Sequence, residues 1–548
     1  MVHSAHDYPH FFEGLSMNIS TLIVSCILSI FSTAVMSYIA MATAIGPWIT
    51  PTVVLCAILL LSLVPGSLCI QNIGFVTVAS SIGGILATAL GFSLPTLYFL
   101  DPLLFDTWLA APYYFVTVTV VLSLSSGWLG MWIANVAEQK LIDEEKLSFP
   151  VGELAYSMIT AASNQIRKAY ELGVGFVSTF VFCILQHGIG LFQSLIPKTC
   201  TIFGPVSLGY VCIPIVRLDL FPLFWAVGFV TGHMVVIPLV VGVLAKIFLL
   251  EPLNKIWFAH LTSVEFVLAF CSGMVLSGAF TGFSKLPKQL WQGLITLRTS
   301  MGTRYMQGTN GMYNKLLEFF LVIIFCVGVL TYFNFSYISQ AYLLVFTGIC
   351  AYQIAAIAGK IGLALLGRYA TFVLVPGMLV FGYDAIQIMI VSTFVQIAGG
   401  VATDVLFGRK IGQLAHMDHV TLKKYQYLGL LVSSVAAGIA MWLLINHFHL
   451  GSDQLFAPKA QARQLLVQAK QFDYWVLLLG ALFGYLLDTI KVSSTLVFGG
   501  LLMPVNLVLG LVVGGLSTWL TKDKEAWYPF WSGVFAANSI WMILQALI

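Results

Sequence analysis

Apolar runs of about 20 residues follow one another along most of the chain, and they limit what it can fold into. A helix needs about 20 apolar residues to cross the hydrocarbon core of a bilayer. The runs lie near 18–43, 47–66, 68–97, 107–137, 170–196, 219–249, 262–281, 314–333, 338–366, 369–382, 385–404, 423–447, 473–491, 495–520 and 528–547. Shorter runs at 150–165 and 284–300 are candidates for re-entrant or interfacial segments. The pattern predicts an all-α polytopic membrane protein with about 14–16 transmembrane helices.

Charged residues are too rare for a soluble protein. Only 9% of the 548 residues are charged and 59% are hydrophobic, whereas a soluble domain has about 25% charged residues. This composition excludes a soluble enzyme, a disordered scaffold and a nucleic-acid-binding protein, since a net charge of +3 gives no basic patch. The expected surroundings are therefore a lipid bilayer, with no nucleic acid as partner.

The nine cysteines form no CxxC pair, so neither a zinc site nor an iron–sulfur cluster is expected. Cys200 and Cys212 bracket a loop between two spans and could form a disulfide if that loop faces an oxidising compartment. Residues 1–17 contain no Lys or Arg, so the first apolar run is interpreted as a span rather than a secretory signal.

Basic residues concentrate in three connecting segments, 138–168, 285–315 and 409–424. The positive-inside rule places these segments in the cytoplasm. The connections 44–47 and 98–106 lack Lys and Arg and are predicted to face outward. The expected division is an N-terminal tail (1–17), a first transmembrane half (18–281), an amphipathic charged linker (282–313) and a second transmembrane half (314–548).

A weak internal repeat supports two duplicated halves. Gln71 is followed by Pro95 and Asp101, and Gln353 is followed at similar spacings by Pro376 and Asp384. The glycine- and proline-bearing positions Gly83–Gly84, Pro150–Gly152, Pro376–Gly377, Gly399–Gly400 and Gly499–Gly500 are predicted either to break helices or to pack them closely. Duplicated halves with broken or re-entrant helices are a common architecture of secondary transporters.

Ionisable residues inside apolar runs are the candidates for function, because each costs at least about 2.5 kcal/mol at the bilayer centre. Glu153, Asp384 and Asp404 are such acids, and Lys360 lies in the middle of AIAGKIGLALL. Lys360 could pair with Asp384 or Asp404, or it could bind an anionic group of a substrate. Snorkelling to an interface or a static ion pair is the structural alternative for each residue.

No catalytic motif is present, so the chain is not expected to be an enzyme. The sequence lacks a GxxxxGK[ST] phosphate loop, an HExxH helix and a GxSxG elbow. Without a phosphate loop the chain does not hydrolyse ATP itself, and no cofactor is expected.

Four stretches of the chain resemble the oligopeptide transporter (OPT) superfamily, which includes peptide transporters and yellow-stripe-like carriers of metal chelates. They are an Ala/Gly/Ser-rich segment ending in a Phe-Ser-Leu-Pro turn, a basic loop followed by LSFPVG, an apolar segment with a Thr-Gly-His, and an Asp-x-x-x-Gly loop. The stretches lie at 70–101, 128–158, 224–244 and 403–432.

The resemblance implies a proton-coupled importer of small oligopeptides, with a membrane-embedded cavity between two related halves and the proton gradient as its energy source. Such a carrier needs a titratable acid, and the candidates are Glu153, Asp384 and Asp404. The residues expected to line the substrate site are Gln71, Asn72, Tyr352, Gln353 and Lys360.

Three alternatives remain at this point. The stretch at 351–370 carries Lys360 where the family has an Asn-Pro signature, which keeps import of a metal chelate or siderophore-like ligand open. A passive channel and a polytopic lipid-modifying enzyme are the others. Compact loops favour the inner (plasma) membrane of a bacterium, and a homodimer is kept as an option.

Overall fold

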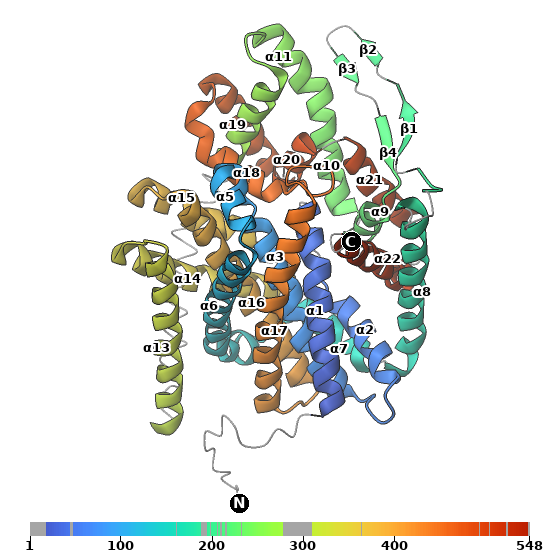
Figure 1. Ribbon diagram of the computed structural model, residues 1–548, viewed down its shortest axis with the longest axis vertical. Coiled ribbons are helices and arrows are strands. Elements are labelled where there is room, and N and C mark those ends of the chain that lie inside the picture. The colour runs from blue at the N-terminus through green and yellow to red at the C-terminus, as the bar shows by residue number, and fades with distance from the viewer. Residues whose placement is uncertain are drawn as a thin grey trace, which may run out of the picture.

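The structure is a computed structural model, and it is almost entirely helical (Figure 1). The residues that it describes are 18–43, 46, 48–160, 162–187, 194–197, 199–204, 206–208, 211–213, 216–231, 233–277, 309–362, 364–490, 492, 494–503, 505–521 and 524–545. The predicted tail 1–17 and most of the predicted linker 282–313 lie outside these residues, so the proposed division of the chain stays a prediction.

The helices of the first part of the chain vary from one turn to more than seven turns. They are α1 (Ile19–Ala42), α2 (Thr50–Ser62), α3 (Ile70–Ser93), α4 (Thr96–Leu100), α5 (Pro102–Leu109), α6 (Pro112–Glu138), α7 (Pro150–Thr160), α8 (Ala162–His187), α9 (Pro222–Thr231), α10 (His233–Ala245), α11 (Glu251–Trp257) and the helix Ser263–Ser277. π-helical turns η1 (Gln139–Glu144) and η2 (Lys246–Leu250) continue α6 and α10.

The second part of the chain is mostly helical among its described residues. Its helices are α13 (Thr309–Tyr332), α14 (Tyr337–Ile361), α15 (Leu366–Phe381), α16 (Ala385–Leu414), α17 (His419–His447), α18 (Pro458–Val467), α19 (Tyr474–Thr489), α20 (Ser494–Leu502), α21 (Val505–Leu520) and α22 (Lys524–Gln545), with a 3-10 turn η3 (Gln468–Gln471) after α18.

The predicted fold class, an all-α polytopic membrane protein, is confirmed. Eight helices are long and apolar enough to cross a membrane, and six further apolar helices of 10–17 residues lie among the described residues. Within the described part of the chain, the strands form two small antiparallel ladders, β1 (Thr199–Phe203) with β4 (Val216–Asp219) and β2 (Val206–Leu208) with β3 (Val211–Ile213). Cys200, on β1, is a free cysteine, so the structure does not contain the suggested Cys200–Cys212 disulfide.

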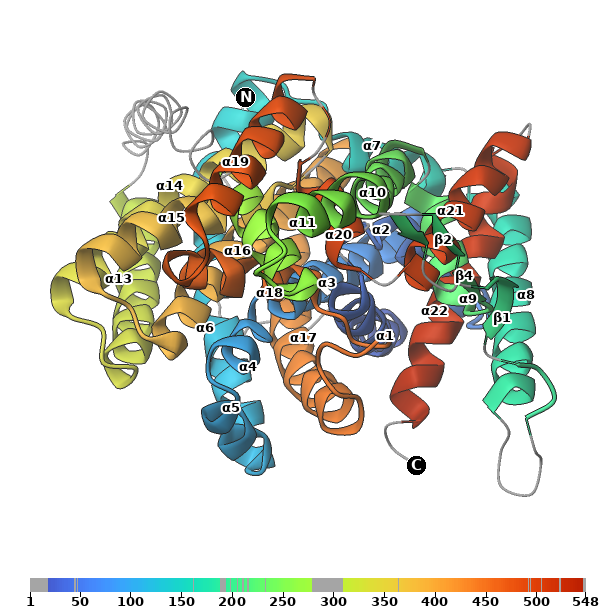
Figure 2. The same cartoon turned by 90° about the horizontal axis from the view of Figure 1, so that it is seen from above.

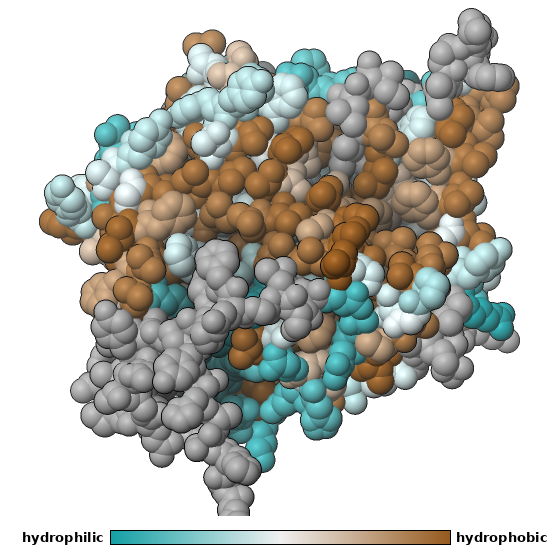
Figure 3. Space-filling model, turned by 60° about the horizontal axis from the view of Figure 1, so that its bottom comes forward, coloured by the Kyte–Doolittle hydropathy of each residue, from teal (hydrophilic) through white to brown (hydrophobic). Residues whose placement is uncertain are grey.

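α3 and α16 form the centre of the bundle, and Figure 2 shows them enclosed by the other helices. Nearly every residue of both helices is buried, as expected for helices that are apolar on all sides. By contrast, α8 lies at the edge and leaves one apolar face uncovered, formed by Tyr170, Val174, Val177, Val181 and Leu185. Figure 3 shows a broad band of apolar side chains across the molecule, with hydrophilic side chains above and below it. The uncovered apolar faces are the surface that a bilayer would cover.

Four pairs of helices cross so closely that each helix contributes a glycine to the contact. A Cβ added to either glycine would lie 1.9–2.2 Å from a backbone carbonyl oxygen of the partner helix, less than any real Cβ contact. The pairs are Gly175 and Gly533 (α8 and α22), Gly228 and Gly514 (α9 and α21), Gly242 and Gly500 (α10 and α20), and Gly273 and Gly480 (helix Ser263–Ser277 and α19). Membrane helices pack in this way because small residues let their backbones approach.

Two of these crossings are related by an internal repeat. Gly228 faces the carbonyl of Leu511, and Gly500 faces the carbonyl of Leu239. Gly500 lies 272 positions after Gly228, and Leu239 lies 272 positions before Leu511, so the two contacts are equivalent. The same offset relates LVVGVL at 239–244 to LVVGGL at 511–516. Segment α9–α10 and segment α20–α21 therefore are copies that pack about a local two-fold axis.

The repeat expected from sequence used different positions and a different offset. Gln71 lies in the first turn of α3, whereas Gln353 lies well inside α14. Pro95 follows α3, but Pro376 lies inside α15. The two stretches are therefore built differently, and isolated matching residues do not define the repeat.

The glycine pairs Gly83–Gly84 and Gly399–Gly400 do not break their helices. Both pairs lie inside continuous helices, α3 and α16. A Cβ on Gly83 would collide with the hydroxyl of Thr33 and one on Gly399 with the side chain of Ile354. Of the two alternatives considered for these positions, close packing is therefore correct.

Two glycines of α8 give a matched test of the crossings. Replacing Gly175 by Ala should destabilise the protein by about 1–3 kcal/mol, because the new methyl group meets the carbonyl oxygen of Phe530. Gly173 has nothing within 4 Å of its added Cβ, so Gly173→Ala should be neutral or stabilising by about 0.5–1 kcal/mol. The fraction of protein that stays monodisperse after heating in detergent measures both. Equal loss in the two variants would contradict this account of the crossing.

Candidate functional site

A polar cavity of about 450 Å³ opens where the ends of α6, α13, α16 and α17 meet. It lies at the end of the molecule at which α1 begins, the lower end in Figure 1. This end carries the basic segments around 140 and 409–424, which the positive-inside rule assigns to the cytoplasm. Its lining residues are Trp132, Asn135, Val136, Glu138, Gln139, Ile142, Asp143, Glu318, Arg409, Gly412, Gln413, Met417, His419, Leu422 and Lys423.

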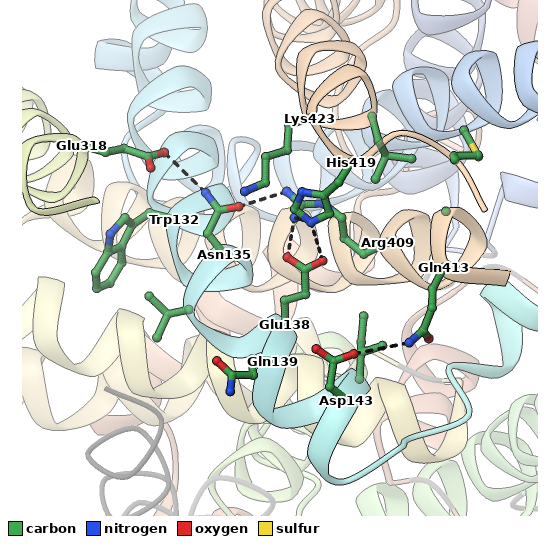
Figure 4. A pocket seen from close by; sticks show the side chains of 15 residues that line it. Trp132, Asn135, Glu138, Gln139, Asp143, Glu318, Arg409, Gln413, His419 and Lys423 are labelled. Atoms are coloured by element: carbon green, nitrogen blue, oxygen red, sulfur yellow. Dashed lines mark hydrogen bonds and ion pairs between the residues drawn. The ribbon is translucent and has the colours of Figure 1, made fainter. Parts of the chain in front are cut away.

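The Arg409 side chain is the centre of the hydrogen-bond network beside this cavity (Figure 4). Its guanidinium is almost fully buried and donates from Nη1 to Glu138 Oε2 at 2.5 Å. Nε donates to Gln426 Oε1 at 2.8 Å, and Nη2 donates to Asn135 Oδ1 at 3.0 Å. Every nitrogen of the guanidinium therefore has a partner, and the group joins α16 to both α6 and α17.

Glu138 has a second basic partner. Its Oε1 lies 2.8 Å from His419 Nε2, and the same imidazole nitrogen lies 3.2 Å from Arg409 Nη1. The Glu138 carboxylate is therefore held between a guanidinium on α16 and an imidazole on α17. The imidazole is half exposed, whereas the Arg409 side chain is not, so His419 is the member of the trio that water reaches most easily.

Local capping fixes where His419 lies. Asp418 precedes the first turn of α17 and accepts hydrogen bonds from the Thr421 hydroxyl at 2.6 Å and the Thr421 amide at 2.8 Å. These hydrogen bonds lower the pKa of the Asp418 carboxyl, because they favour its charged form. A charged N-cap at this point stabilises the helix start and places His419 directly against Glu138.

Glu318 and Asp143 add negative charge to the rim. Glu318, on α13, accepts from the Tyr427 hydroxyl at 2.5 Å and from Asn135 Nδ2 at 3.5 Å. Asp143, on the π-helical turn η1, accepts from Gln413 Nε2 at 3.3 Å. Lys423, on α17, adds a positive charge to the cavity and lies beside Asn135 and His419 (Figure 4). The cavity therefore presents both signs of charge to whatever enters it.

A second polar element lies deeper in the bundle, between α3 and α16. Asp404 is 2% exposed and accepts a hydrogen bond from the Ser81 hydroxyl at 2.7 Å. Its other carboxyl oxygen has no hydrogen-bond partner among the described residues. Asp404 precedes Arg409 by five positions on α16, which corresponds to about 7 Å along the helix axis. Asp404 is thus a buried acid that lies deeper in the bundle than the acids of the cavity.

Polar contacts continue along α16 beyond Asp404. The Thr393 hydroxyl lies 3.0 Å from the Ser93 hydroxyl on α3. Gln396 is fully buried, and neither its amide oxygen nor its amide nitrogen has a partner within the described part of the chain. An unpaired buried amide is costly, so a water or solute group is the natural partner for Gln396.

The residues predicted from sequence to bind substrate do not converge on the cavity. Gln71 is exposed and Asn72 donates from its side chain to Ser67 O at 2.9 Å, both in the first turn of α3. Tyr352 is buried inside α14, Gln353 is half-buried beside it, and Lys360 is exposed in the last turn of that helix. None of the five is among the residues that line the cavity.

The three predicted proton-coupling acids have different surroundings. Glu153 is exposed on α7. Asp384 is exposed and serves as the N-cap of α16, in a capping box with Gln387. Only Asp404 is buried. No ion pair joins Lys360 to Asp384 or Asp404 among the described residues.

Sequence reasoning missed Glu138, Arg409 and His419 as site residues. They lie in the segments 138–168 and 409–424, which the charge pattern had assigned to loops. The helix α16 continues through Arg409 to Leu414, and α17 begins at His419. The available signal concerns Arg409, since the apolar pattern continues on both sides of FGRK at 407–410 with no proline to end the helix.

A pair of charge deletions tests how much the buried ion pair contributes. Glu138→Gln should destabilise the protein by about 3 kcal/mol, because it leaves the buried Arg409 guanidinium uncompensated. The control is Glu144→Gln, which removes the exposed pair with Lys140 at 3.1 Å and should cost less than about 1 kcal/mol. Thermal unfolding in detergent measures both variants. If both variants lose equally little stability, the buried Arg409 guanidinium does not need the Glu138 carboxylate as its counter-charge.

Comparison with protein families assigns the chain. The family model described as OPT oligopeptide transporter protein matches residues 16–540, which is nearly the whole chain and includes every residue of the cavity. Comparison with curated proteins gives no match.

Proposed function

Because the chain belongs to the OPT oligopeptide transporter family, we propose that it is a proton-coupled secondary transporter that imports small oligopeptides by alternating access. The family is one of transporters rather than enzymes, and the chain is a multi-pass membrane protein. The observation that carries the proposal is the cavity with both signs of charge at the end assigned to the cytoplasm. We take this cavity as the substrate site, which the family match by itself does not locate.

The charges of the cavity suit a zwitterion. A short peptide carries an ammonium group at one end and a carboxylate at the other. Asp143 and Glu318 can receive the ammonium, while Lys423 and the outer edge of the Arg409 network can receive the carboxylate. A volume of about 450 Å³ lies within the usual range of about 300–1,000 Å³ for small-molecule sites, so the substrate is a peptide of few residues.

Asp404 is the best candidate for the coupling proton. A coupling acid must be neutral when it is buried and charged only when water or a cation reaches it. Asp404 is the one predicted acid that is buried, it has a single hydrogen bond, and no cation contacts it among the described residues. Its place just inside the cavity lets a proton move between the core and the cytoplasmic mouth.

The Arg409 network offers the switch for alternating access. It joins α6, α16 and α17 through one guanidinium. A conformational change that separates α6 from α16 must break the contact between Glu138 and Arg409, which a substrate carboxylate and ammonium can replace one for one. The orientation toward the cytoplasm is proposed from the charge pattern of the connections, and the inner membrane of a bacterium is proposed from the compact loops.

Uptake into proteoliposomes under an imposed inward proton gradient tests the proposal. Accumulation of di- to pentapeptides that collapses when the gradient is removed is the expected result. Glutathione and iron chelates belong in the same panel, because accumulation of a chelate alone would make the chain a chelate importer. Peptide accumulation that is the same with and without the proton gradient would contradict proton coupling.

Three acid variants identify the coupling residue. Asp404→Asn should abolish gradient-driven accumulation while leaving exchange of labelled for unlabelled peptide in place, since exchange needs no net proton movement. Asp384→Asn is the matched control, because asparagine is an equally good N-cap and coupling should persist. Glu153→Gln, at an exposed position, should also retain coupling. Loss of coupling in either control with retention in Asp404→Asn would refute the assignment.

A further inference from the structure

Cationic side chains gather at the opposite end of α3 from the cavity. α3 begins beside the cavity, where Gly74 faces the side chain of Met417. Phe92 and Thr96, about 27 Å further along by helix rise, contact α18 instead. α18 presents Lys459 and Arg463 to them. These residues take no part in the site described so far.

Arg463 is buried without an acidic partner. It is 4% exposed, and its Nη1 donates to the carbonyl oxygen of Phe92 and, at 3.3 Å, to the Thr96 hydroxyl. Its Nε has no hydrogen-bond partner among the described residues. Lys459 lies one turn earlier on the same face of α18, with its Nζ 5.8 Å from the centroid of the Phe92 ring.

The electrostatics of this cluster are unbalanced. No ion pair with a carboxylate is formed by Lys459, Arg463 or the nearby Arg368 within the described residues. Burial, together with the positive charges of Arg463 and Arg368, lowers the pKa of Lys459 to about 8. Two like charges one turn apart on a helix repel each other, and an unpaired buried charge is costly. An anion between them would remove both penalties.

Capping of α3 explains only part of the arrangement. α3 ends at Ser93, so the backbone carbonyls of its last turn, that of Phe92 included, lie where a helix lacks its own donors. The Arg463 Nη1 atom supplies one. Among the described residues this leaves the Nε of Arg463 without a hydrogen-bond partner, and the Lys459 ammonium with the face of the Phe92 ring as its contact.

We propose that Lys459 and Arg463 form a binding site for the carboxylate of the transported solute, at the end of the bundle opposite the charged cavity. This inference rests on the proposed function for the identity of the solute. The exposed Arg368 on α15 adds a positive field that draws anions toward the site. With the cavity at the cytoplasmic end, this second site is where a solute carboxylate is first held.

Equilibrium binding to the purified full-length chain tests the site without requiring transport. The probes are acetate, trialanine and trialanine amide, which differ in whether a free carboxylate is present. Wild-type protein should bind trialanine about tenfold more tightly than its amide, because one charge-assisted hydrogen bond is at stake. Lys459→Met should weaken this preference, and what remains of it belongs to the cytoplasmic cavity, where Lys423 can also receive the carboxylate. Lys424→Met, at an exposed lysine of the cytoplasmic end, should keep it.

A conservative variant guards against loss of folding. Arg463→Lys keeps the positive charge and should retain more of the preference for the free carboxylate than Arg463→Gln, which should weaken it as Lys459→Met does. If Lys459→Met and Arg463→Gln are folded and still prefer trialanine over its amide as the wild type does, the site is refuted. Failure of the wild type to bind acetate or trialanine refutes it as well.

The outcomes separate this site from the proposed function. Carboxylate binding that depends on Lys459, in a protein that accumulates no peptide, would leave the site standing and remove peptide import. Gradient-driven peptide uptake by a Lys459→Met variant whose carboxylate preference is unchanged would leave peptide import standing and remove the site. An anionic headgroup is the competing ligand: if Lys459→Met lowers retention of phosphatidylglycerol in nanodiscs and leaves acetate binding unchanged, the solute site is refuted.

Discussion

Close backbone contact between helices is the constraint on which the rest of the structure depends. Lipid offers no hydrophobic driving force for helix association, so packing of small residues must provide much of it. The reciprocal glycine crossings of α8 to α10 and the helix Ser263–Ser277 with α19 to α22 leave no room for a single added methyl group.

The charged site is built on contacts of the same type. Gly130 of α6 faces the carbonyl of Ala398 on α16, and Gly429 of α17 faces the carbonyl of Ala79 on α3. These contacts hold α6 against α16 and α17 against α3, and the four helices together position Glu138, Arg409 and His419. A buried guanidinium is tolerable only when all its donors are satisfied, and the three helices satisfy it jointly. The network therefore reports whether the helices are in this arrangement.

Sequence reasoning reached the fold class but only part of the site. Apolar runs of the length of a span identify helices without knowledge of their neighbours, and an acid within such a run identified Asp404. Its partner Ser81, 323 positions away, could not be predicted, because no local signal encodes which helices pack. The same limit applies to Gly83 and Gly399, because a glycine pair in the sequence is compatible with either a helix break or close packing of two helices. Arg409 was assigned to a loop because a charge normally ends a span, whereas here a distant Glu138 neutralises it.

In the proposed transport cycle, the charged cavity opens to the cytoplasm in this conformation and closes during transport. Labelling of Gln413→Cys by a membrane-impermeant maleimide tests it, with the exposed Cys69 and Cys200 replaced by serine. The account predicts labelling in inside-out but not in right-side-out vesicles, and slower labelling when trialanine and an inward proton gradient shift the carrier through its cycle. Labelling from the outside, or a rate that neither peptide nor gradient changes, would contradict it.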